Sequence, residues 1–298
     1  MNDFIHPISD DFQNIYFIEG ERKGNYPYSN SLLIDDCLID TGISARYMKK
    51  LIKEFPINSV LLSHWHEDHI PSNHLLENSK FMCHAKDKDP IEDIEMIYSL
   101  YRVENTPAGD DFRALIGMMG MKNTKIYKTF EDNEIIEVGD DLGVKVIFTP
   151  GHTAGHCAFI EMKSKIAFFG DIDLTRFPYY ATVDSDLMEL EKSIERLKSV
   201  DVNIAVLGHR DLVVGKNLIK EELDDFKSVI EKRDERILSN LSENTPIRPI
   251  DLKDKNLIYR KYSYNFEVIS ELVMIEKHFD KYLSQNLIIS EGDGFILN

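Results

Sequence analysis

Residues 64–69 read His64-Trp65-His66-Glu67-Asp68-His69, and they directly follow a short apolar segment, residues 59–62, that is predicted to be a strand. In an extended chain the side chains of residues i and i+2 point to the same side, so His64 and His66 can bind one metal ion. The chain then turns, which lets Asp68 and His69 face a second ion beside the first. Gathering several imidazoles costs free energy unless a cation compensates them. The segment therefore predicts a metal site.

Three further candidate ligands also follow strand-like apolar segments. His152 lies in Thr149-Pro150-Gly151-His152-Thr153-Ala154-Gly155-His156, Asp171 follows Phe169-Gly170, and His209 follows Leu207-Gly208. A side chain at the end of a strand is delivered to the edge of the sheet. We therefore expect these three residues to join the first segment at one edge of the fold.

A known family carries the same residue types in the same order. The pattern from His64 to His209 resembles the metal-binding motifs of the metallo-β-lactamase-fold hydrolase superfamily, and the resemblance covers about residues 12–215. It implies an α/β (α+β) fold, a four-layer αββα sandwich with a dinuclear metal site at one edge. It also implies two metal sites that share one bridging carboxylate: His64, His66 and His152 at the first, Asp68, His69 and His209 at the second, and Asp171 between them.

The ligand set indicates a subgroup of this superfamily. Asp171 occupies a position where the best-known zinc β-lactamases use cysteine, and Cys157 lies near His152 but not at that position. Residues 151–156 are similar to glyoxalase II. The site thus resembles the glyoxalase II and lactonase side of the superfamily.

Such a ligand set implies a specific chemistry. Two divalent ions that share a water molecule lower its pKa and supply hydroxide near neutral pH, which attacks a carbonyl carbon or a phosphorus atom. Asp68 is the predicted catalytic residue, because it can orient the nucleophile and carry a proton. Ligation by nitrogen and oxygen favours Zn²⁺, and Fe or Mn would also fit.

Four residues beside the predicted ligands are expected to support the site or to contact substrate. Asp40, in Leu38-Ile39-Asp40-Thr41-Gly42, resembles the early strand–turn of the family and is expected to support the ligands. His156 exceeds the expected ligand count, so we assign it a supporting role. Tyr179 and Tyr180 follow Asp171 in a stretch that lies near the substrate pocket in this superfamily, which makes them candidates for substrate binding.

Three functions remain open at this point. The leading one is hydrolysis of a thioester, ester or lactone carbonyl by a metal-bridging hydroxide, as in a hydroxyacylglutathione hydrolase. The first alternative is a phosphodiesterase or ribonuclease of the same fold. The second is a persulfide dioxygenase, which would use a single iron ion.

The pattern of apolar residues suggests two domains. Residues 1–218 form the predicted catalytic domain, in which two amphipathic helices within residues 90–120 are an insertion that can act as a lid. A helix capped by Ser185 is expected over 185–199. Residues 219–298 are predicted to form two helices and a terminal hairpin, a small winged-helix-like domain that packs against the sandwich.

The charge of the chain indicates which classes of binding partner are expected. The chain has 298 residues, with 52 Asp and Glu against 35 Lys and Arg, and residues 221–298 are themselves acidic. This charge argues against nucleic acid and against an anionic membrane surface, so a small-molecule substrate is expected, and a homodimer is compatible. Three scattered cysteines make a disulfide framework improbable, and no leader segment is visible at the N-terminus, which together favour the cytoplasm.

Overall fold

The computed structural model describes residues 2–8, 12, 14–139 and 141–298. Its largest sheet has seven strands in the order β1-β2-β3-β4-β5-β6-β7. The first four strands pair antiparallel, and β4 to β7 are parallel. The strands run as follows: β1 Ile5–Pro7, β2 Ile15–Ile18, β3 Ser31–Ile34, β4 Cys37–Ile39, β5 Ser59–Leu61, β6 Lys80–His84 and β7 Lys128–Phe130.

The second sheet has six strands in the order β13-β12-β11-β10-β9-β8. Among the described residues, β11 and β12 pair in parallel and the other neighbours in this sheet pair antiparallel. Its strands are β8 Ile135–Val138, β9 Leu142–Phe148, β10 Cys157–Glu161, β11 Ile166–Phe168, β12 Ile204–Val206 and β13 Val213–Val214.

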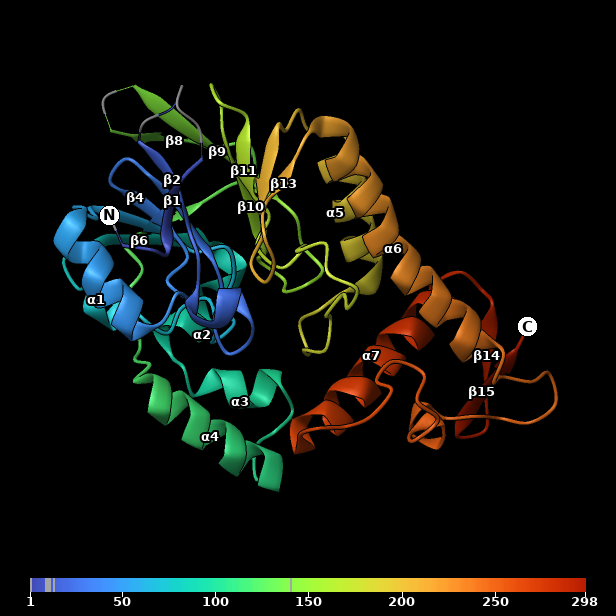
Figure 1. Ribbon diagram of the computed structural model, residues 1–298. Coiled ribbons are helices and arrows are strands. Elements are labelled where there is room, and N and C mark those ends of the chain that lie inside the picture. Colours follow the sequence, from blue (N-terminus) through green and yellow to red (C-terminus); the bar gives the residue numbers. More distant parts are fainter. Residues whose placement is uncertain (1, 9–11, 13, 140) are drawn as a thin grey trace.

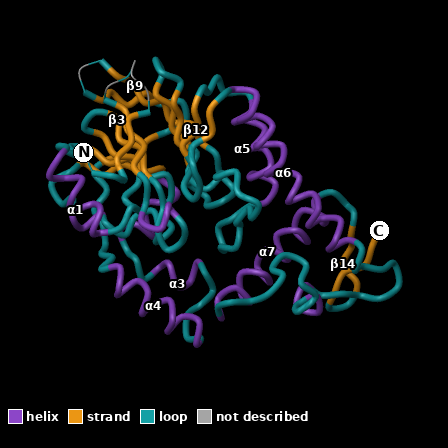
Figure 2. The backbone as a smooth tube through the Cα atoms, viewed as in Figure 1, coloured by secondary structure: helices purple, strands orange, loops and turns teal. Residues whose placement is uncertain are grey.

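The two sheets pack face to face between two layers of helices (Figures 1 and 2). Side chains at alternating strand positions, such as Leu32 and Ile34 or Val144 and Val146, fill the space between the sheets. The outer face of the first sheet is covered by α1 (Ala45–Glu54), α2 (Lys88–Glu92), α3 (Met96–Leu100) and α4 (Pro107–Met119). The outer face of the second is covered by α5 (Leu187–Lys198) and α6 (Lys216–Leu238), and α7 (Asn265–Ser284) packs against these two helices beyond the sheet (Figure 1). The predicted αββα sandwich is thus confirmed.

The helical segment before α4 differs from its prediction. Ile91, Ile94, Ile97 and Tyr101 do not lie on one continuous helix, because the chain is extended at Asp93 between the short helices α2 and α3. The side-chain oxygen of Asn123 accepts the N–H of Ile94 there, which replaces a helical hydrogen bond. The following helix, α4, is present as expected, and the Thr106 hydroxyl caps it by accepting the N–H of Gly109.

The predicted cap of α5 is also wrong. Asp186, and not Ser185, caps this helix by accepting the N–H of Glu189. The hydroxyl of Ser185 instead donates to the carbonyl of His152 at 2.7 Å. The sequence pattern predicted the helix correctly, but its serine hydroxyl binds a neighbouring loop and does not cap the helix.

The C-terminal part of the chain consists of α6, α7 and a hairpin. The hairpin joins β14 (Ile288–Glu291) to β15 (Gly294–Leu297) and confirms the prediction for this segment. Buried residues of α6 and α7, including Phe226 and Met274, belong to the same hydrophobic cluster as the outer face of the second sheet. The winged-helix-like character of this part stays a prediction, as does the domain boundary at residue 218, which lies in the first turn of α6.

Short 3-10 turns complete the structure, at Glu21–Gly24, Asn73–Leu75, Ala85–Asp87 and Pro249–Leu252. Within the described residues, every helix is too short or too polar to cross a bilayer. The three cysteines are buried and unpaired.

Candidate metal centre

All seven predicted ligands meet at one edge of the sandwich, where strands of both sheets end. His64, His66, Asp68 and His69 lie in the loop after β5, and His152 lies in the loop between β9 and β10. Asp171 follows β11, and His209 follows β12. Four loops from two sheets therefore deliver these side chains to one place.

The first group is built from three buried imidazoles. Nε2 of His152 lies 2.8 Å from Nδ1 of His66 and 3.2 Å from Nε2 of His64. The ligand atoms of these residues and of Asp171 all lie within 4.8 Å of one another. Four nitrogen and oxygen donors at such spacing match the coordination that a divalent transition metal ion prefers.

The second group lies beside the first. Nε2 of His209 is 3.3 Å from Nε2 of His69 and 3.4 Å from Oδ2 of Asp68. The donor atoms of the three residues again lie within 4.8 Å of one another. The sequence motif thus divides between two groups, with His64 and His66 in one and Asp68 and His69 in the other.

Asp171 faces both groups with different oxygens. Its Oδ2 lies 3.3 Å from His152 Nε2 and 3.9 Å from His64 Nε2. Its Oδ1 lies 2.8 Å from His69 Nε2 and 3.3 Å from His209 Nε2. Oδ1 is buried and makes no hydrogen bond of acceptable geometry with the described residues. A buried acceptor in this state fits a cation between the two groups.

The electrostatics divide the imidazoles in the same way. Burial, together with neighbouring imidazoles, lowers the pKa of His64 and of His66 well below the usual value, and burial lowers the pKa of His152. These three are therefore neutral at pH 7, which is the metal-binding form. Burial opposes protonation of His69 and His209 as well, but Asp171 raises the pKa of both, that of His209 to about 10. Burial also opposes ionisation of Asp171, yet the imidazoles facing it lower its pKa well below the ordinary range.

Hydrogen bonds donated by Nδ1 orient four of the imidazoles toward the centre. Nδ1 of His152 donates to the carbonyl of Tyr179 at 2.8 Å, and Nδ1 of His209 donates to the carbonyl of Gly24 at 2.7 Å. These bonds leave each Nε2 lone pair free to face a cation, an arrangement typical of histidine metal ligands.

Asp40 and Ser63 hold the other two imidazoles. One oxygen of Asp40 lies 2.6 Å from Nδ1 of His69 and also accepts the Ser63 hydroxyl, while the other accepts the Ser63 N–H. The hydroxyl of Ser63 in turn lies 2.8 Å from Nδ1 of His64 and accepts from it. Asp40 lies close enough to His64 and His69 to form a third donor group. Its oxygens are already occupied by these contacts, so the structure places it behind the ligands.

The loop that carries His152 is anchored at several points. Asp87 accepts the hydroxyl of Thr153 at 2.7 Å and the N–H of Gly155 at 2.6 Å. Gly151 has a φ of 124°, and a Cβ there would lie 2.1 Å from the backbone nitrogen of Leu190. His156 is buried, and its Nε2 accepts the N–H of Asp171. The sequence predicted this supporting position for His156, whereas nothing in the sequence singled out Asp87.

The two tyrosines after Asp171 are placed differently. Tyr179 lines a cavity of about 630 Å³, the inner cavity, which also reaches His66, Asp68 and His209. Tyr180 is fully buried, and its hydroxyl contacts Nε2 of His278 at 2.8 Å and not the cavity. Tyr180 was expected either to support the site or to contact substrate. Its position fits a supporting role and does not fit contact with a substrate in the inner cavity.

Glu67 is a residue of the site that the sequence reasoning missed. It lies between two predicted ligands, and its buried carboxylate accepts the hydroxyls of Tyr26 and Tyr101, each at 2.8 Å. Burial, with the nearby Asp68, raises the pKa of Glu67 to about 7. Its place inside the motif was a signal, but its tyrosine partners are distant in the sequence.

The comparisons with known proteins agree with this geometry. The family model described as Metallo-beta-lactamase superfamily matches residues 9–209. A β-lactamase-like protein 2 homolog of Caenorhabditis elegans is 21% identical over 256 residues, which cover 82% of this chain and 74% of the relative. A hydroxyacylglutathione hydrolase (GloC) of Haemophilus influenzae is 28% identical over 152 residues, which cover 48% of this chain and 65% of the relative.

The solved structures agree in fold. A metallo-β-lactamase family protein from Thermus thermophilus superposes with a TM-score of 0.69 at 16% identity, over 99% of this chain and 97% of that one. A β-lactamase domain protein from Burkholderia ambifaria gives a TM-score of 0.74 at 15% identity, over 98% and 94% of the two chains. Both similarities extend through the C-terminal part of the chain.

Proposed function

The chain belongs to the metallo-beta-lactamase superfamily of metal-dependent hydrolases, and from this premise we propose that it binds two divalent metal ions and hydrolyses a thioester, ester or lactone carbonyl. The observation that carries the proposal is the position of Asp171. One of its oxygens faces the imidazoles of His64 and His152, and the other faces those of His69 and His209. A single carboxylate shared in this way supports a bridged pair of cations.

The donors are suited to such cations. We propose His64, His66 and His152 as ligands of one ion, Asp68, His69 and His209 as ligands of the other, and Asp171 as the bridge. A donor set of nitrogen and oxygen without thiolate favours Zn²⁺, with Fe or Mn as substitutes. Bound there, the ions would supply an acidified water molecule and a Lewis acid for the substrate oxygen.

The chain's own residues account for the rest of the catalysis. Asp68 lines the inner cavity, and we propose that its carboxylate orients the attacking water and holds the proton that the water loses. Asp40, Ser63 and the carbonyl of Tyr179 fix the imidazoles before substrate arrives, so little reorganisation is needed. The aromatic side chains of the inner cavity would position the substrate and limit the access of bulk water.

Two relatives favour a carbonyl substrate over a phosphodiester. Besides the hydroxyacylglutathione hydrolase, an atrochrysone carboxyl ACP thioesterase of Aspergillus fumigatus is 23% identical over 214 residues, 68% of this chain and 56% of the relative. Both names describe thioester cleavage. We propose further that the substrate is a small molecule and not a nucleic acid, and that the protein works in the cytoplasm, which the unpaired thiols support.

The test combines metal analysis with a substrate panel. Purified protein is loaded with Zn²⁺, Mn²⁺ or Fe²⁺, its metal content per chain is measured, and its turnover of thioesters, lactones and bis-nitrophenyl phosphate is compared. Two ions per chain and turnover of a carbonyl substrate are expected. A single iron with thiol-dependent oxygen uptake, or turnover of the phosphodiester alone, would reject the proposal in favour of a dioxygenase or a phosphodiesterase.

A further inference from the structure

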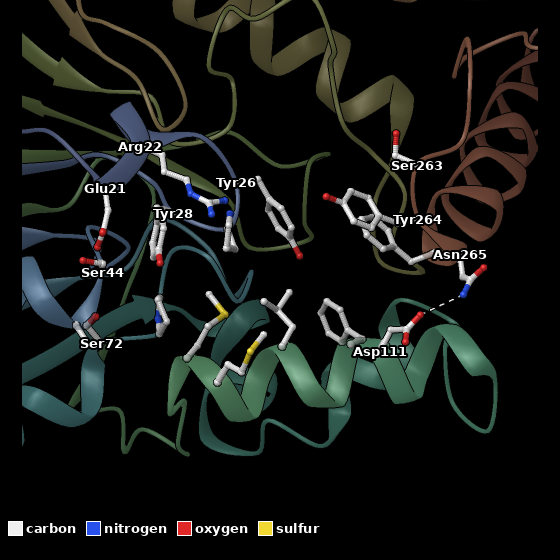
Figure 3. A pocket seen from close by; sticks show the side chains of 18 of the residues that line it. Glu21, Arg22, Tyr26, Tyr28, Ser44, Ser72, Asp111, Ser263, Tyr264 and Asn265 are labelled. Atoms are coloured by element: carbon white, nitrogen blue, oxygen red, sulfur yellow. Dashed lines mark hydrogen bonds between the residues drawn. The ribbon is translucent and has the colours of Figure 1, made fainter.

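We infer that a second cavity binds the arm of the substrate that lies remote from the scissile carbonyl, and that this arm is an extended apolar chain ending in a carboxylate or another anion. The inference rests on the proposed hydrolase function and specifies its substrate class. The second cavity, called the outer cavity, has a volume of about 840 Å³ and is lined by the 21–28 loop, the start of α1, α4 and residues 262–268 (Figure 3).

The outer cavity adjoins the cavity that contains the predicted metal ligands. Four residues line both cavities, and all four are aromatic: Tyr26, Phe112, Tyr264 and Phe266. Tyr26 is anchored to the metal-site segment, because its hydroxyl donates to Glu67. The phenyl ring of Phe266 stacks on Tyr264 with their centroids 5.6 Å apart. Flat aromatic walls at this boundary suit the passage of a slender chain between the two spaces.

One wall of the outer cavity is apolar. It is formed by α4, which presents Leu115, Met118 and Met119, and Met118 is 80% exposed. Methionine side chains adapt to ligands of varied shape, and an exposed one beside a cavity is available for contact. This wall favours a hydrocarbon chain over a polar arm.

The polar end of the outer cavity offers an unpaired cation. Arg22 and its neighbour Lys23 both have positive φ values, 55° and 60°, which non-glycine residues rarely adopt. Figure 3 shows the Arg22 guanidinium directed into the space between Tyr26 and Tyr28. No ion pair among the described residues includes Arg22, whereas the nearby Arg46 is paired with Glu21 at 2.7 Å. Arg22 is exposed to solvent, and a free guanidinium that lines a cavity is suited to a carboxylate or phosphate.

Two further polar groups line the outer cavity. Ser72 lines the outer cavity, is 1% exposed, and its hydroxyl has no hydrogen-bond partner among the described residues. A buried hydroxyl without a partner is costly, so a polar ligand atom would be favoured beside it. The carboxylate of Asp111, on the opposite wall, accepts from the amide of Asn265 at 3.1 Å. The acidic groups of the cavity thus have partners, and its uncommitted groups are donors.

The experiment compares two series of substrates with the metal-loaded protein. The first contains nitrophenyl esters of acetate, octanoate and octanedioate, in which the arm belongs to the acyl group. The second contains acetyl thioesters of ethanethiol, octanethiol and 8-mercaptooctanoate, in which the arm belongs to the leaving group. In one of the series we expect kcat/KM to rise with chain length and to rise about tenfold further when the chain ends in a carboxylate.

Variants assign this preference to residues. Arg22→Gln should remove the preference for the terminal carboxylate but keep the preference for chain length. Met119→Trp places a larger side chain in the space beside the apolar wall, and it should remove the preference for chain length. Lys23→Gln is the matched control, because Lys23 is exposed as Arg22 is but does not line the cavity, and it should retain both preferences. Equal rates for short, long and carboxylated substrates in both series would overturn the inference, as would an unchanged carboxylate preference in Arg22→Gln.

A binding measurement separates this inference from the proposed function. The monoanilide of octanedioate is an amide with the same chain and carboxylate, and its binding can be followed by calorimetry whether or not the protein hydrolyses esters. Binding that is weakened about tenfold by Arg22→Gln and not by Lys23→Gln would support the outer cavity even if every ester is refused. No binding to the wild-type protein would reject it, even if short esters are cleaved.

Discussion

Two of the buried polar clusters among the described residues differ in whether their charged groups have hydrogen-bond partners inside the protein. At the predicted metal centre, five imidazoles and two carboxylates converge, and Asp171 Oδ1 and His66 Nε2 have no hydrogen-bond partner among the described residues. The second cluster lies between α6, α7 and the 177–180 segment. There the guanidinium of Arg233 donates to the carbonyl of Pro178 at 2.6 Å and to the Tyr180 hydroxyl at 3.0 Å.

The second cluster is closed. His278 connects Tyr180 to Asp234, and Lys281 donates to Asp234 and to Glu191. Each charged group named here has a partner inside the protein, so the cluster needs no ligand. The comparison teaches that buried charge by itself does not mark a functional site. A functional site is indicated where buried charged or polar groups have no partner inside the protein.

The two clusters are joined through consecutive carbonyl groups. Pro178 accepts from Arg233, and Tyr179 accepts from Nδ1 of His152. The C-terminal part of the chain therefore holds the segment that orients a predicted metal ligand. Four predictions test this distinction between an open cluster and a closed one.

The largest effect is expected from Asp171→Ala, which removes the carboxylate shared by both donor groups. Metal content should fall below two ions per chain, and hydrolysis should fall about 1000-fold or more, because several kcal/mol of transition-state stabilisation depend on the ions. Metal analysis and kcat/KM for a thioester provide the measurements.

The control for this variant is Asp211→Ala, at an exposed carboxylate two residues after His209, which should behave as the wild type does. Circular dichroism would show that both variants fold. Full metal content and full activity in Asp171→Ala would refute the assignment of the site.

The sequence predicts the metal ligands better than the residues that support them. The ligands were predictable because each lies within a few residues of a recognisable strand end and because the loop at 64–69 holds four of them. The αββα layers followed from the resemblance that those ligands carry. Short apolar runs located the strands that precede the ligands, whereas a strand as short as Val213–Val214 gave too few residues for a pattern.

The supporting residues were predicted less well, because their partners are distant in the sequence. Arg233 reads as one more charge on an amphipathic helix, yet it is 1% exposed and contacts a loop 55 residues away. Ser185 read as a helix cap because its type and position fit one. Only the folded structure shows that the hydroxyl of Ser185 donates to the carbonyl of His152.

The next largest effect is expected from Arg233→Met. Loss of two hydrogen bonds from a buried cation should lower the free energy of unfolding by about 3 kcal/mol. Since the 178–179 segment would loosen around His152, the affinity for metal should also fall about tenfold, as when an outer partner of a ligand is removed. Urea unfolding and metal transfer to a chromogenic chelator measure the two effects.

Arg236→Met, at an exposed arginine on the same helix, is the matched control and should change neither quantity much. Arg233→Lys should recover part of the metal affinity, because it keeps the charge. If Arg233→Met lowered stability but left the metal affinity intact, the C-terminal part would be a stabilising element without influence on the site.

A smaller effect, visible as a pH dependence, is expected from Asp87→Asn. Burial, with the nearby Asp184, raises the pKa of Asp87 to about 8, against about 4 in an unfolded chain. Between these values the folded state holds one proton more, so stability is complete below pH 4 and falls as pH rises toward 8. Cys83 and Cys157 also face Asp87, and their thiols stay protonated because burial raises their pKa as well.

The asparagine cannot ionise, so the fall in melting temperature between pH 5 and pH 8 should be shallower in Asp87→Asn than in the wild type. The slope that Asp87 contributes is at most about 1.4 kcal/mol per pH unit. Asp89→Asn, at an exposed position of α2, should leave the wild-type slope unchanged. An identical slope in all three proteins would show that Asp87 is ionised throughout this range.

The smallest effect is expected where the two parts of the chain meet at the surface. Arg102, after α3, forms an ion pair with Glu276 of α7, but their side chains are 43% and 31% exposed. Solvent screens such a pair, so a double-mutant cycle with Arg102→Ala and Glu276→Ala should give a coupling energy below about 1 kcal/mol, decreasing further with salt. A coupling energy above that of the Arg233–Tyr180 pair would mean that surface charge fastens α7 near the site. A lower value would mean that the closed cluster holds α7 in place, because the partners in that cluster are shielded from water.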